Sequence, residues 1–355
     1  MAGSLDSLPL VSIIVPVFNG ERYLRESLDS ILAQTYPRTE VLVMDDASTD
    51  TTPEIIASYA NRVKYYRQSQ NRGIYGNAND GITIARGEYV AVYHADDLYR
   101  PNIVEREVAF LLRYPKAGAA FCLEIFIDAS GRERSRVEIP PEVRGSYPLS
   151  YEVIFNALLK YKNRFLCCPT SMVRASVYHE VGTYRDGEFL NSSDLEMWLR
   201  INEKYPIGIL EEYLLRYRYG HGNSSQRYHH LRTDPERYFR IMDLYLENSA
   251  RAIATPEALA AYEGHRAEDR LMRSVNHYIM AQLAQSQQVL DQVRPAQIFA
   301  SDQIQSGRLL VLFLLLKILV CLPRIPFVAK LFRQRWHIKK LPRRSNLQLS
   351  TLSAG

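Results

Sequence analysis

The chain has 355 residues, of which 46% are hydrophobic and 23% are charged. This composition is typical of a globular protein with a buried core, and the length exceeds that of one average domain. Ten of the 44 Lys and Arg residues follow Asp302, where no acidic residue occurs, so the first 302 residues hold 34 basic against 39 acidic side chains. An acidic body excludes general nucleic-acid binding, which needs a basic stripe along the fold.

The first 130 residues alternate apolar, β-rich runs with amphipathic stretches, which predicts βαβ units around a mainly parallel sheet. The run from Val11 to Val17 is almost continuously apolar, as expected for a strand covered on both faces. The further expected strands are 40–45, 63–68, 89–94 and 117–127, and the expected helices are 23–32, 52–59, 75–85 and 101–112.

The pattern changes after this region. Residues 132–150 are rich in Pro, Gly and charge, which predicts a loop or linker. Helical patterns return at 151–159 and 195–203, and from 235 to 297 the pattern is helical almost throughout. We therefore expect an α/β fold with a C-terminal helical extension, divided into a catalytic domain at 1–230, a helical extension at 231–305 and a membrane-associating basic tail at 306–355.

The tail combines an apolar run with a basic end. Residues 309–322 are apolar except for Lys317, and a helix of this length spans about 21 Å, which is less than the ~30 Å hydrocarbon core of a bilayer. We expect this segment to lie on an anionic membrane surface as a peripheral or monotopic anchor. The alternative is a soluble core helix followed by a disordered basic end.

The N-terminus and the cysteines bear on the compartment. Residues 1–9 lack a charged segment followed by an apolar one, so we expect no secretory signal and a body on the cytoplasmic face. The four cysteines lack the paired spacing of a zinc site or a disulfide framework, and we interpret them as reduced packing residues.

Polar residues follow each of the first four expected strands, where ligands of open α/β sheets bind. They are Pro16-Val17-Phe18-Asn19-Gly20, Asp45-Asp46-Ala47-Ser48-Thr49-Asp50, Asn71-Arg72-Gly73 and His94-Ala95-Asp96-Asp97. Taken singly, the second could simply cap a helix and the third could be an ordinary turn. The adjacent carboxylates of Asp96 and Asp97 repel each other and are tolerated best around a cation, for which Mg²⁺ or Mn²⁺ is expected.

In their order and sequence these motifs, over residues 9–225, resemble glycosyltransferase family 2, whose fold is GT-A. The resemblance implies an inverting enzyme that moves a sugar from a nucleotide-diphosphate sugar to a glycan or lipid-linked acceptor. The positions that match the family's donor-binding residues are Pro16, Phe18, Asn19, Asp46, Asn71, Arg72, Gly73 and Asp96. Those that match its metal-binding residues are Asp96, Asp97 and His221, and His94 stands where many members have the first Asp of the metal motif.

The segment Ser193-Asp194-Leu195-Glu196-Met197-Trp198 resembles the family's catalytic-base motif, with Ser193 in place of the usual Glu. The resemblance implies that Asp194 takes the proton of the acceptor hydroxyl. Asp194 could equally cap the helix that follows, and the two roles are compatible. Together with the tail, this predicts a role in cell-envelope polysaccharide or glycolipid synthesis.

Other enzyme classes fit less well. A nucleotidyltransferase would need a Gly-rich, Lys-containing loop after the first strand, and a dinucleotide dehydrogenase would need G-x-G-x-x-G where this chain has Phe18-Asn19-Gly20-Glu21. A non-catalytic protein of the same fold that binds sugar nucleotides stays open as the alternative.

Overall fold

The computed structural model describes residues 7–220, 231–298 and 303–321. They form two compact units. The first combines the described residues of Met1–His230 with Glu236–Glu263, and the second combines those of Leu231–Pro235 and Gly264–Gly355. The domain boundaries expected at residues 230 and 305 stay predictions, and the structure groups the residues from Glu236 to Glu263 with the first unit.

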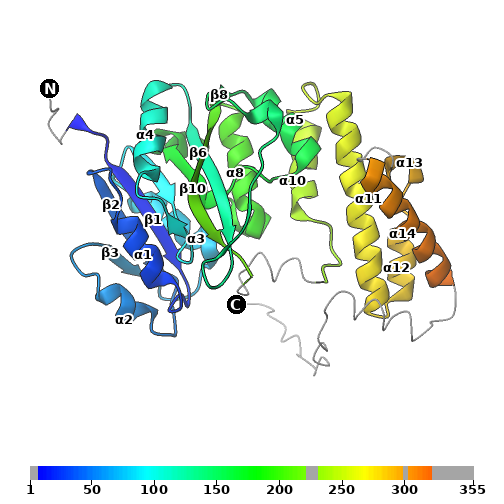
Figure 1. The fold of residues 1–355 in the computed structure, drawn as a ribbon, viewed down its shortest axis with the longest axis horizontal. Coiled ribbons are helices and arrows are strands. Elements are labelled where there is room, and N and C mark those ends of the chain that lie inside the picture. Colours follow the sequence, from blue (N-terminus) through cyan, green and yellow to red (C-terminus); the bar gives the residue numbers. More distant parts are fainter. Residues whose placement is uncertain (1–6, 221–230, 299–302, 322–355) are drawn as a thin grey trace, which may run out of the picture. The chain divides into compact units, whose positions relative to one another are not determined.

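A single sheet organises the first unit (Figure 1). Its strand order is β3-β2-β1-β4-β9-β6-β10-β5, with β7 added on β6 and β8 on β10. The strands are β1 (Val11–Val17), β2 (Thr39–Asp45), β3 (Lys64–Arg67), β4 (Tyr89–Val92), β5 (Leu98–Tyr99), β6 (Ala119–Ile127), β7 (Glu133–Arg136), β8 (Pro148–Leu149), β9 (Ser171–Arg174) and β10 (Ile207–Arg218).

Strand direction divides this sheet into a parallel half and a mixed half. The strands β3, β2, β1 and β4 are all parallel neighbours. In the second half β9 runs antiparallel between β4 and β6, and β10 runs parallel to β6. As a result β4, β6 and β10 point the same way as β1, and their carboxyl ends lie at one edge of the sheet.

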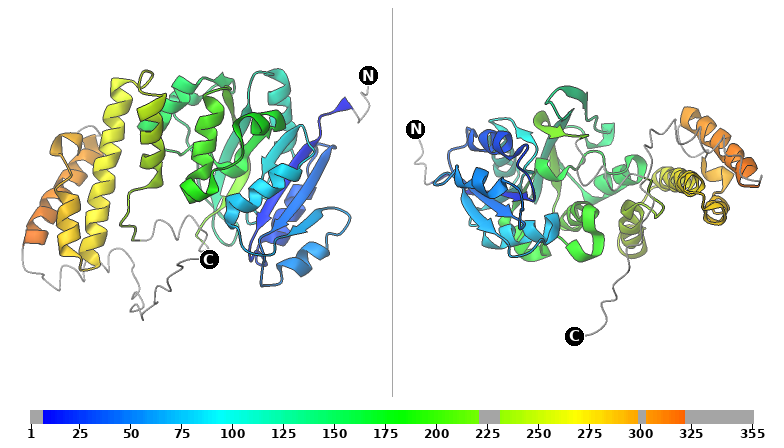
Figure 2. Two further views of the ribbon diagram at one scale, coloured as in Figure 1. Left: turned by 180° about the vertical axis from the view of Figure 1, so that it is seen from behind. Right: turned by 90° about the horizontal axis from the view of Figure 1, so that it is seen from below.

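Helices cover both faces of the sheet (Figures 1 and 2). On β1 the side chains alternate between the two cores, with Ile13 and Val15 in one and Ile14 in the other. This double burial explains why the strand is apolar at almost every position. One face packs against α1 (Leu24–Leu32), α2 (Thr52–Ala57) and α4 (Ile103–Arg113), and the other against α3 (Gly73–Ile84), α5 (Tyr151–Tyr161), α6 (Ala175–Val181) and α8 (Ser193–Asn202). Helix α10 (Arg237–Asn248) packs against α5 and α8.

The structure confirms the expected α/β fold and corrects it in the second half of the sheet. Residues 132–150, predicted as a loop or linker, contain β7, β8 and the short helix η2 (Pro141–Val143). Both strands pair antiparallel with long central strands, β7 with β6 and β8 with β10, which is why a charged and Pro-rich stretch becomes ordered. The sequence also gave no expectation for β9 or β10.

The second unit is helical, as predicted for the C-terminal extension. It holds the later part of α11 (Pro256–Ile279) with α12 (Leu283–Leu290), α13 (Pro295–Ile298) and α14 (Gln303–Cys321). Its core includes Leu271 and Val275 of α11, Leu290 of α12, and Phe313 and Leu316 of α14. Among the described helices, none has the length and apolarity needed to cross a bilayer.

Candidate functional site

The predicted site residues gather at the carboxyl edge of the sheet. Strands β1, β2, β3, β4, β6 and β10 all end there. The antiparallel strand β9 begins at this edge, preceded by the short helix η3 (Cys168–Thr170). This is the edge at which open α/β sheets bind their ligands.

The loop after β1 is bonded to the loop after β2. The amide of Asn19 donates to Ser48 Oγ at 3.0 Å, and Asn19 Oδ1 accepts from the amide of Thr49 at 2.8 Å. Asn19 has a φ of 51°, in the left-handed region that Asn tolerates better than most residues. Of the two other predicted donor-binding residues here, Pro16 lies within β1 and Phe18 is 50% exposed, so its ring is free to contact a ligand.

Asp46 joins the loop after β2 to the loop after β3. Its two carboxylate oxygens accept from the amides of Arg72 at 2.7 Å and Gly73 at 2.9 Å. The Gly73 amide also donates to Asn71 Oδ1 at 3.1 Å, and Gly73 has a φ of 78° that suits glycine. Burial raises the pKa of Asp46, and the hydrogen bonds from the two backbone amides offset part of that rise.

The acidic loop after β4 carries a group of possible metal ligands. One ligand atom each from His94, Asp96 and Asp97 lies within 4.8 Å of the others. Asp97 is fully buried and Asp96 is partly exposed, so Asp96 is the carboxylate nearer to solvent. The sequence proposed Asp96 and Asp97 as ligands, and the structure adds His94 to them.

The chemistry of this group depends on burial. Burial and the neighbouring Asp96 raise the pKa of Asp97 well above its usual range, and burial lowers the pKa of His94. Asp97 Oδ2 and His94 Nε2 have no hydrogen-bond partner among the described residues. The neutral imidazole is the form of His that binds a divalent cation. Asp97 must lose its proton to bind one, and the charge of a cation would favour that loss.

Asp194 lies in the first turn of α8, and its carboxyl group hydrogen-bonds the side chain of Tyr75 on α3. Burial raises the pKa of Asp194 to about 6, although the Leu195 amide and Tyr75 oppose the shift. A carboxylate with this pKa is ionised at neutral pH and is a stronger base than an ordinary Asp. Ser193 does not replace the missing acid, because its hydroxyl donates to the carbonyls of Arg185 and Leu190.

The remaining predicted ligand, His221, lies outside the described residues. The chain is described up to Gly220, two residues beyond the end of β10 at Arg218. Whether His221 approaches the acidic loop therefore stays a prediction.

Three residues at this edge were not assigned from the sequence. Arg218 contacts both aspartates of the acidic loop, Tyr75 contacts Asp194, and Glu124 is a buried carboxyl on β6. Burial raises the pKa of Glu124 to about 8. Arg218 is the last residue of β10, which ends at the site, so a prediction of this strand from the sequence would also have predicted Arg218 as a site residue. Tyr75 and Glu124 carry no comparable signal in the sequence.

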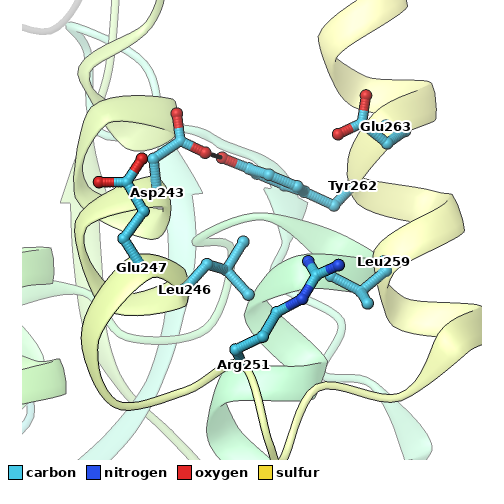
Figure 3. A pocket seen from close by; sticks show the side chains of 7 residues that line it. All are labelled: Asp243, Leu246, Glu247, Arg251, Leu259, Tyr262 and Glu263. Atoms are coloured by element: carbon cyan, nitrogen blue, oxygen red, sulfur yellow. Dashed lines mark hydrogen bonds between the residues drawn. The ribbon is translucent and has the colours of Figure 1, made fainter.

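Two pockets open in the first unit. One of about 680 Å³ adjoins the ends of β6 and β10 and is lined by residues that include Phe126, Ala129, Arg134 and Tyr219. The other, of about 490 Å³, lies between α10 and the start of α11 (Figure 3). In it the Tyr262 hydroxyl donates to Asp243 Oδ1 at 2.8 Å, and none of its lining residues belongs to the predicted site.

Comparison with known proteins identifies the class of this fold and site. Residues 12–182 match the family model of glycosyl transferase family 2. An uncharacterized glycosyltransferase of Methanocaldococcus jannaschii is 30% identical over 226 residues, which cover 61% of this chain and 73% of that protein. Another, of Haemophilus influenzae, is 30% identical over 235 residues, which cover 64% of this chain and 70% of that protein.

Some relatives are considerably longer than the matched part. An uncharacterized glycosyltransferase of Rickettsia felis is 30% identical over 222 residues, which cover 62% of this chain and 36% of that protein. The matched part of this chain covers 61% of a similar protein of Rickettsia typhi.

Solved structures show the same architecture. Residues 1–349 of S. aureus TarS in complex with UDP-GlcNAc superpose with a TM-score of 0.59 at 17% sequence identity, covering 92% of each chain. The same fragment in complex with UDP gives a TM-score of 0.54 and covers 84% of this chain and 88% of that one. The fold is thus GT-A, and the chain belongs to glycosyltransferase family 2.

Proposed function

We propose that the protein is an inverting, metal-dependent glycosyltransferase that uses a nucleotide-diphosphate sugar. The observation that carries this proposal is the meeting of three different parts at one sheet edge. Asp46 connects the loops after β2 and β3, to which we assign the nucleotide. The His94, Asp96 and Asp97 group offers cation ligands, and Asp194 supplies a base with a pKa of about 6.

The residues of the acidic loop fit a divalent cation. They offer carboxylate oxygens and one imidazole nitrogen, and the buried Asp97 Oδ2 has no hydrogen-bond partner among the described residues. Mg²⁺ and Mn²⁺ are the cations that such oxygen-rich sites favour. When bound, the cation would neutralise the negative charge that develops on the departing diphosphate.

The nucleotide of the donor is assigned to the loops after β1, β2 and β3. Asp46 can hold the Arg72 and Gly73 amides in one conformation, which fixes Asn71 and Arg72 in the loop after β3, where the nucleotide is assigned. The exposed ring of Phe18 offers an apolar surface for a base. The structure of TarS with UDP-GlcNAc makes UDP sugars the first donors to try.

Asp194 is the residue to which we assign the proton transfer. The ionised carboxylate accepts the proton of an acceptor hydroxyl, whose oxygen forms a bond to the anomeric carbon while the bond from that carbon to the diphosphate oxygen breaks. A single displacement from the opposite face inverts the anomeric centre. The pocket beside Phe126, Arg134 and Tyr219 provides space for a glycan or lipid-linked acceptor with apolar parts.

Membrane attachment through α14 and the basic tail is part of the proposal. Leu309, Phe313 and Leu316 of α14 are buried in the helical unit. The opposite face exposes Val311, Leu314, Leu315 and Ile318, each between 47% and 58% exposed. An exposed apolar face followed by basic residues suits an anionic bilayer surface. Attachment at the cytoplasmic face would place the enzyme among the lipid-linked intermediates of cell-envelope polysaccharides.

Sedimentation with vesicles containing anionic phosphatidylglycerol tests this attachment. Replacing Leu314 and Ile318 with Glu should abolish most of the binding, because the two charges would enter the lipid interface. Leu112→Glu on α4 is the matched control, since Leu112 is equally exposed at 55%. Equal sedimentation of the double variant and the wild type would exclude α14 as the anchor.

The enzymatic proposal is tested with a panel of UDP, GDP, CDP and dTDP sugars. A donor should raise the melting temperature of the chain with Mn²⁺ and not with a chelator, because a ligand that binds only the folded state stabilises it. The same donor should be turned over to its nucleoside diphosphate, by slow hydrolysis when no acceptor is present. Binding without any turnover would favour the non-catalytic sugar-nucleotide-binding alternative, and neither binding nor turnover would contradict the proposal as a whole.

A further inference from the structure

Arg218 is a charged residue buried beneath the acidic loop. It ends β10 at the carboxyl edge of the sheet and is only 2% exposed. Burying a guanidinium costs free energy unless it is paired and hydrogen-bonded, so its partners indicate what this position does. With so little surface, Arg218 holds protein groups in place and has no access to a substrate.

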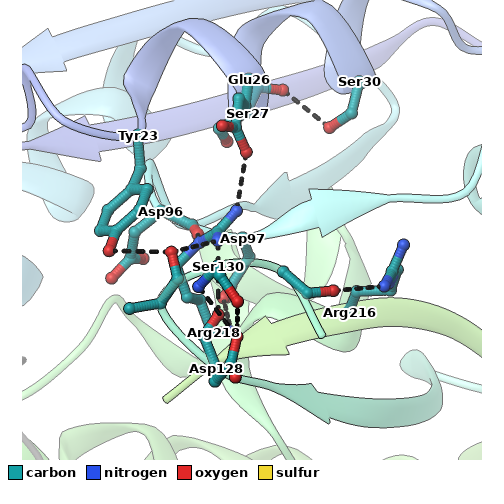
Figure 4. Close-up of polar contacts among 12 residues, drawn as sticks. Tyr23, Glu26, Ser27, Ser30, Asp96, Asp97, Asp128, Ser130, Arg216 and Arg218 are labelled. Atoms are coloured by element: carbon teal, nitrogen blue, oxygen red, sulfur yellow. Dashed lines mark hydrogen bonds and ion pairs between the residues drawn. The ribbon is translucent and has the colours of Figure 1, made fainter. Parts of the chain in front are cut away.

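Its first set of contacts is to the acidic loop itself (Figure 4). The backbone amide of Arg218 donates to Asp97 Oδ1 at 2.7 Å, and its Nε donates to the carbonyl of Asp96 at 2.9 Å. One bond orients the Asp97 side chain and the other fixes the backbone at Asp96. Both candidate carboxylate ligands are therefore positioned by the same residue.

The rest of the guanidinium is tied to two other elements. Nη2 donates to Glu26 Oε2 on α1 at 2.9 Å, and the guanidinium lies over the ring of Tyr23 at 4.3 Å. Nη1 donates to the carbonyl of Ala129, after β6, at 3.4 Å. The Tyr23 hydroxyl also donates to that carbonyl, which joins α1 and β6 around Arg218.

The topology explains why the acidic loop needs contacts that hold it in place, such as those with Arg218. The loop connects β4 to β5, and in the sheet these strands are separated by β9, β6 and β10. The chain between them must therefore cross the sheet edge before Leu98 pairs with Arg216 of β10. Arg218 is two residues further along that same strand and contacts Asp96 and Asp97 on their way across.

We infer that Arg218 is a positioning residue that sets the geometry of Asp96 and Asp97 for the divalent cation, without contacting donor or acceptor. The inference rests on the proposed function, because it concerns the cation site of that activity. If residue 218 only neutralised the charge of the two aspartates, any positively charged side chain, such as that of Lys, would serve at this position. Positioning requires the branched guanidinium, which reaches the loop, α1 and β6 at once.

The test measures the Mn²⁺ requirement in two ways: as the dissociation constant of Mn²⁺ in calorimetric titration of the chain, and as the Mn²⁺ concentration that gives half-maximal turnover of the nucleotide sugar accepted in the donor panel. Arg218→Met should raise both values at least tenfold, and Arg218→Lys should leave both at least threefold above wild type. Arg174→Met is the matched control. Its guanidinium also binds carbonyls, those of Ala117 and Leu111, and lies over a tyrosine ring, but it sits at the opposite edge of the sheet beside the start of β4.

Arg174→Met should lower the melting temperature and leave the Mn²⁺ requirement within twofold of wild type. An unchanged requirement in Arg218→Met, full recovery in Arg218→Lys, or an equal shift in Arg174→Met would overturn the inference. If Arg218→Met does not fold, Tyr23→Leu combined with Glu26→Ala removes two supports of the guanidinium and should raise the requirement at least threefold; no shift there also overturns it. Wild-type turnover that ignores Mn²⁺ would instead contradict the proposed metal dependence.

Discussion

The nucleotide side and the acidic loop of this site are held in place in different ways. On the nucleotide side, Asn19 bonds to Ser48 and Asp46 to Arg72, partners that are 29 and 26 positions apart in the sequence. The acidic loop depends on Arg218, which is 121 positions from Asp97. The first region is assembled from adjacent βαβ units, and the second becomes ordered only when the far end of the sheet is in place.

This difference predicts different consequences of mutation. Several hydrogen bonds hold the loops of the nucleotide side in place, and none of them involves the acidic loop. A single substitution there should therefore weaken donor binding without changing the Mn²⁺ requirement. Asp194 belongs to neither region, because it lies in the first turn of α8 and its side-chain partner is Tyr75 of α3. The predictions below separate chemistry, nucleotide binding and stability, from the largest expected effect to the smallest.

The largest effect is expected from Asp194→Asn. The amide keeps the size of the side chain and cannot accept the hydroxyl proton, so kcat should fall by roughly 100-fold to 10,000-fold. Donor affinity and the Mn²⁺ requirement should stay within about twofold, because neither region is altered. Steady-state turnover and calorimetric donor titration measure both quantities, and a kcat near that of the wild type would remove Asp194 from its role.

The next effect concerns pH. Because burial raises the pKa of Asp194 to about 6, its carboxylate is the active form above that pH and is protonated below it. The logarithm of kcat should therefore fall with a slope of about one as pH drops below 6. The residual turnover of Asp194→Asn should not show this fall below pH 6. If the fall is unchanged in that variant, it arises from the titration of another group.

Asp46→Ala should weaken donor binding about tenfold or more. It leaves the Arg72 amide without its acceptor and the Gly73 amide with Asn71 Oδ1 alone, which should also cost about 2 kcal/mol of unfolding free energy. Asp80→Ala is the control, because Asp80 pairs with Arg72 at 3.0 Å on a far more exposed surface. Donor titration and denaturant unfolding give the two values, and equal losses in the two variants would contradict the role given to Asp46.

The smallest effect is a gain in stability. The folded chain binds the proton of Asp194 more tightly than the unfolded chain, whose Asp has a pKa of 3.8, so stability falls as pH rises from about 4 to about 6. Asp194→Asn removes this cost and should raise the unfolding free energy by about 1 kcal/mol at pH 7.5, allowing for partial solvent exposure. The difference should shrink towards pH 4, and a variant less stable than wild type at pH 7.5 would contradict the raised pKa.

The sequence predicted the parallel half of the fold well because its signals are local. Each buried strand there is a continuous apolar run, and each helix shows its own periodicity. Strand β10 gives no such signal, since Glu211, Glu212 and Arg216 interrupt it and its pairing with β6 shifts register between Ile209 and Leu215. The short strands β5 and β8 exist only because β10 pairs with them.

The candidate site divides in the same way. Asp46, Asp96, Asp97 and Asp194 all follow strands or begin a helix within recognisable motifs, and the structure brings each of them to the same sheet edge. The support that Arg218 gives could not be predicted, because it joins α1, β6 and the acidic loop, three elements that are distant from it in the sequence. Contacts of this kind depend on the assembled sheet.

Calorimetric titration of the wild type with the nucleotide sugar from the donor panel, in Mn²⁺ and in a chelator, tests the central claim most directly. Asp96→Asn is titrated beside it, because Asp96 is the more exposed of the two candidate carboxylate ligands. The wild type should bind the donor at least tenfold more tightly with Mn²⁺, and Asp96→Asn should bind it equally with and without the ion. Donor binding by the wild type that is indifferent to Mn²⁺ would contradict the metal-dependent site proposed at this edge of the sheet.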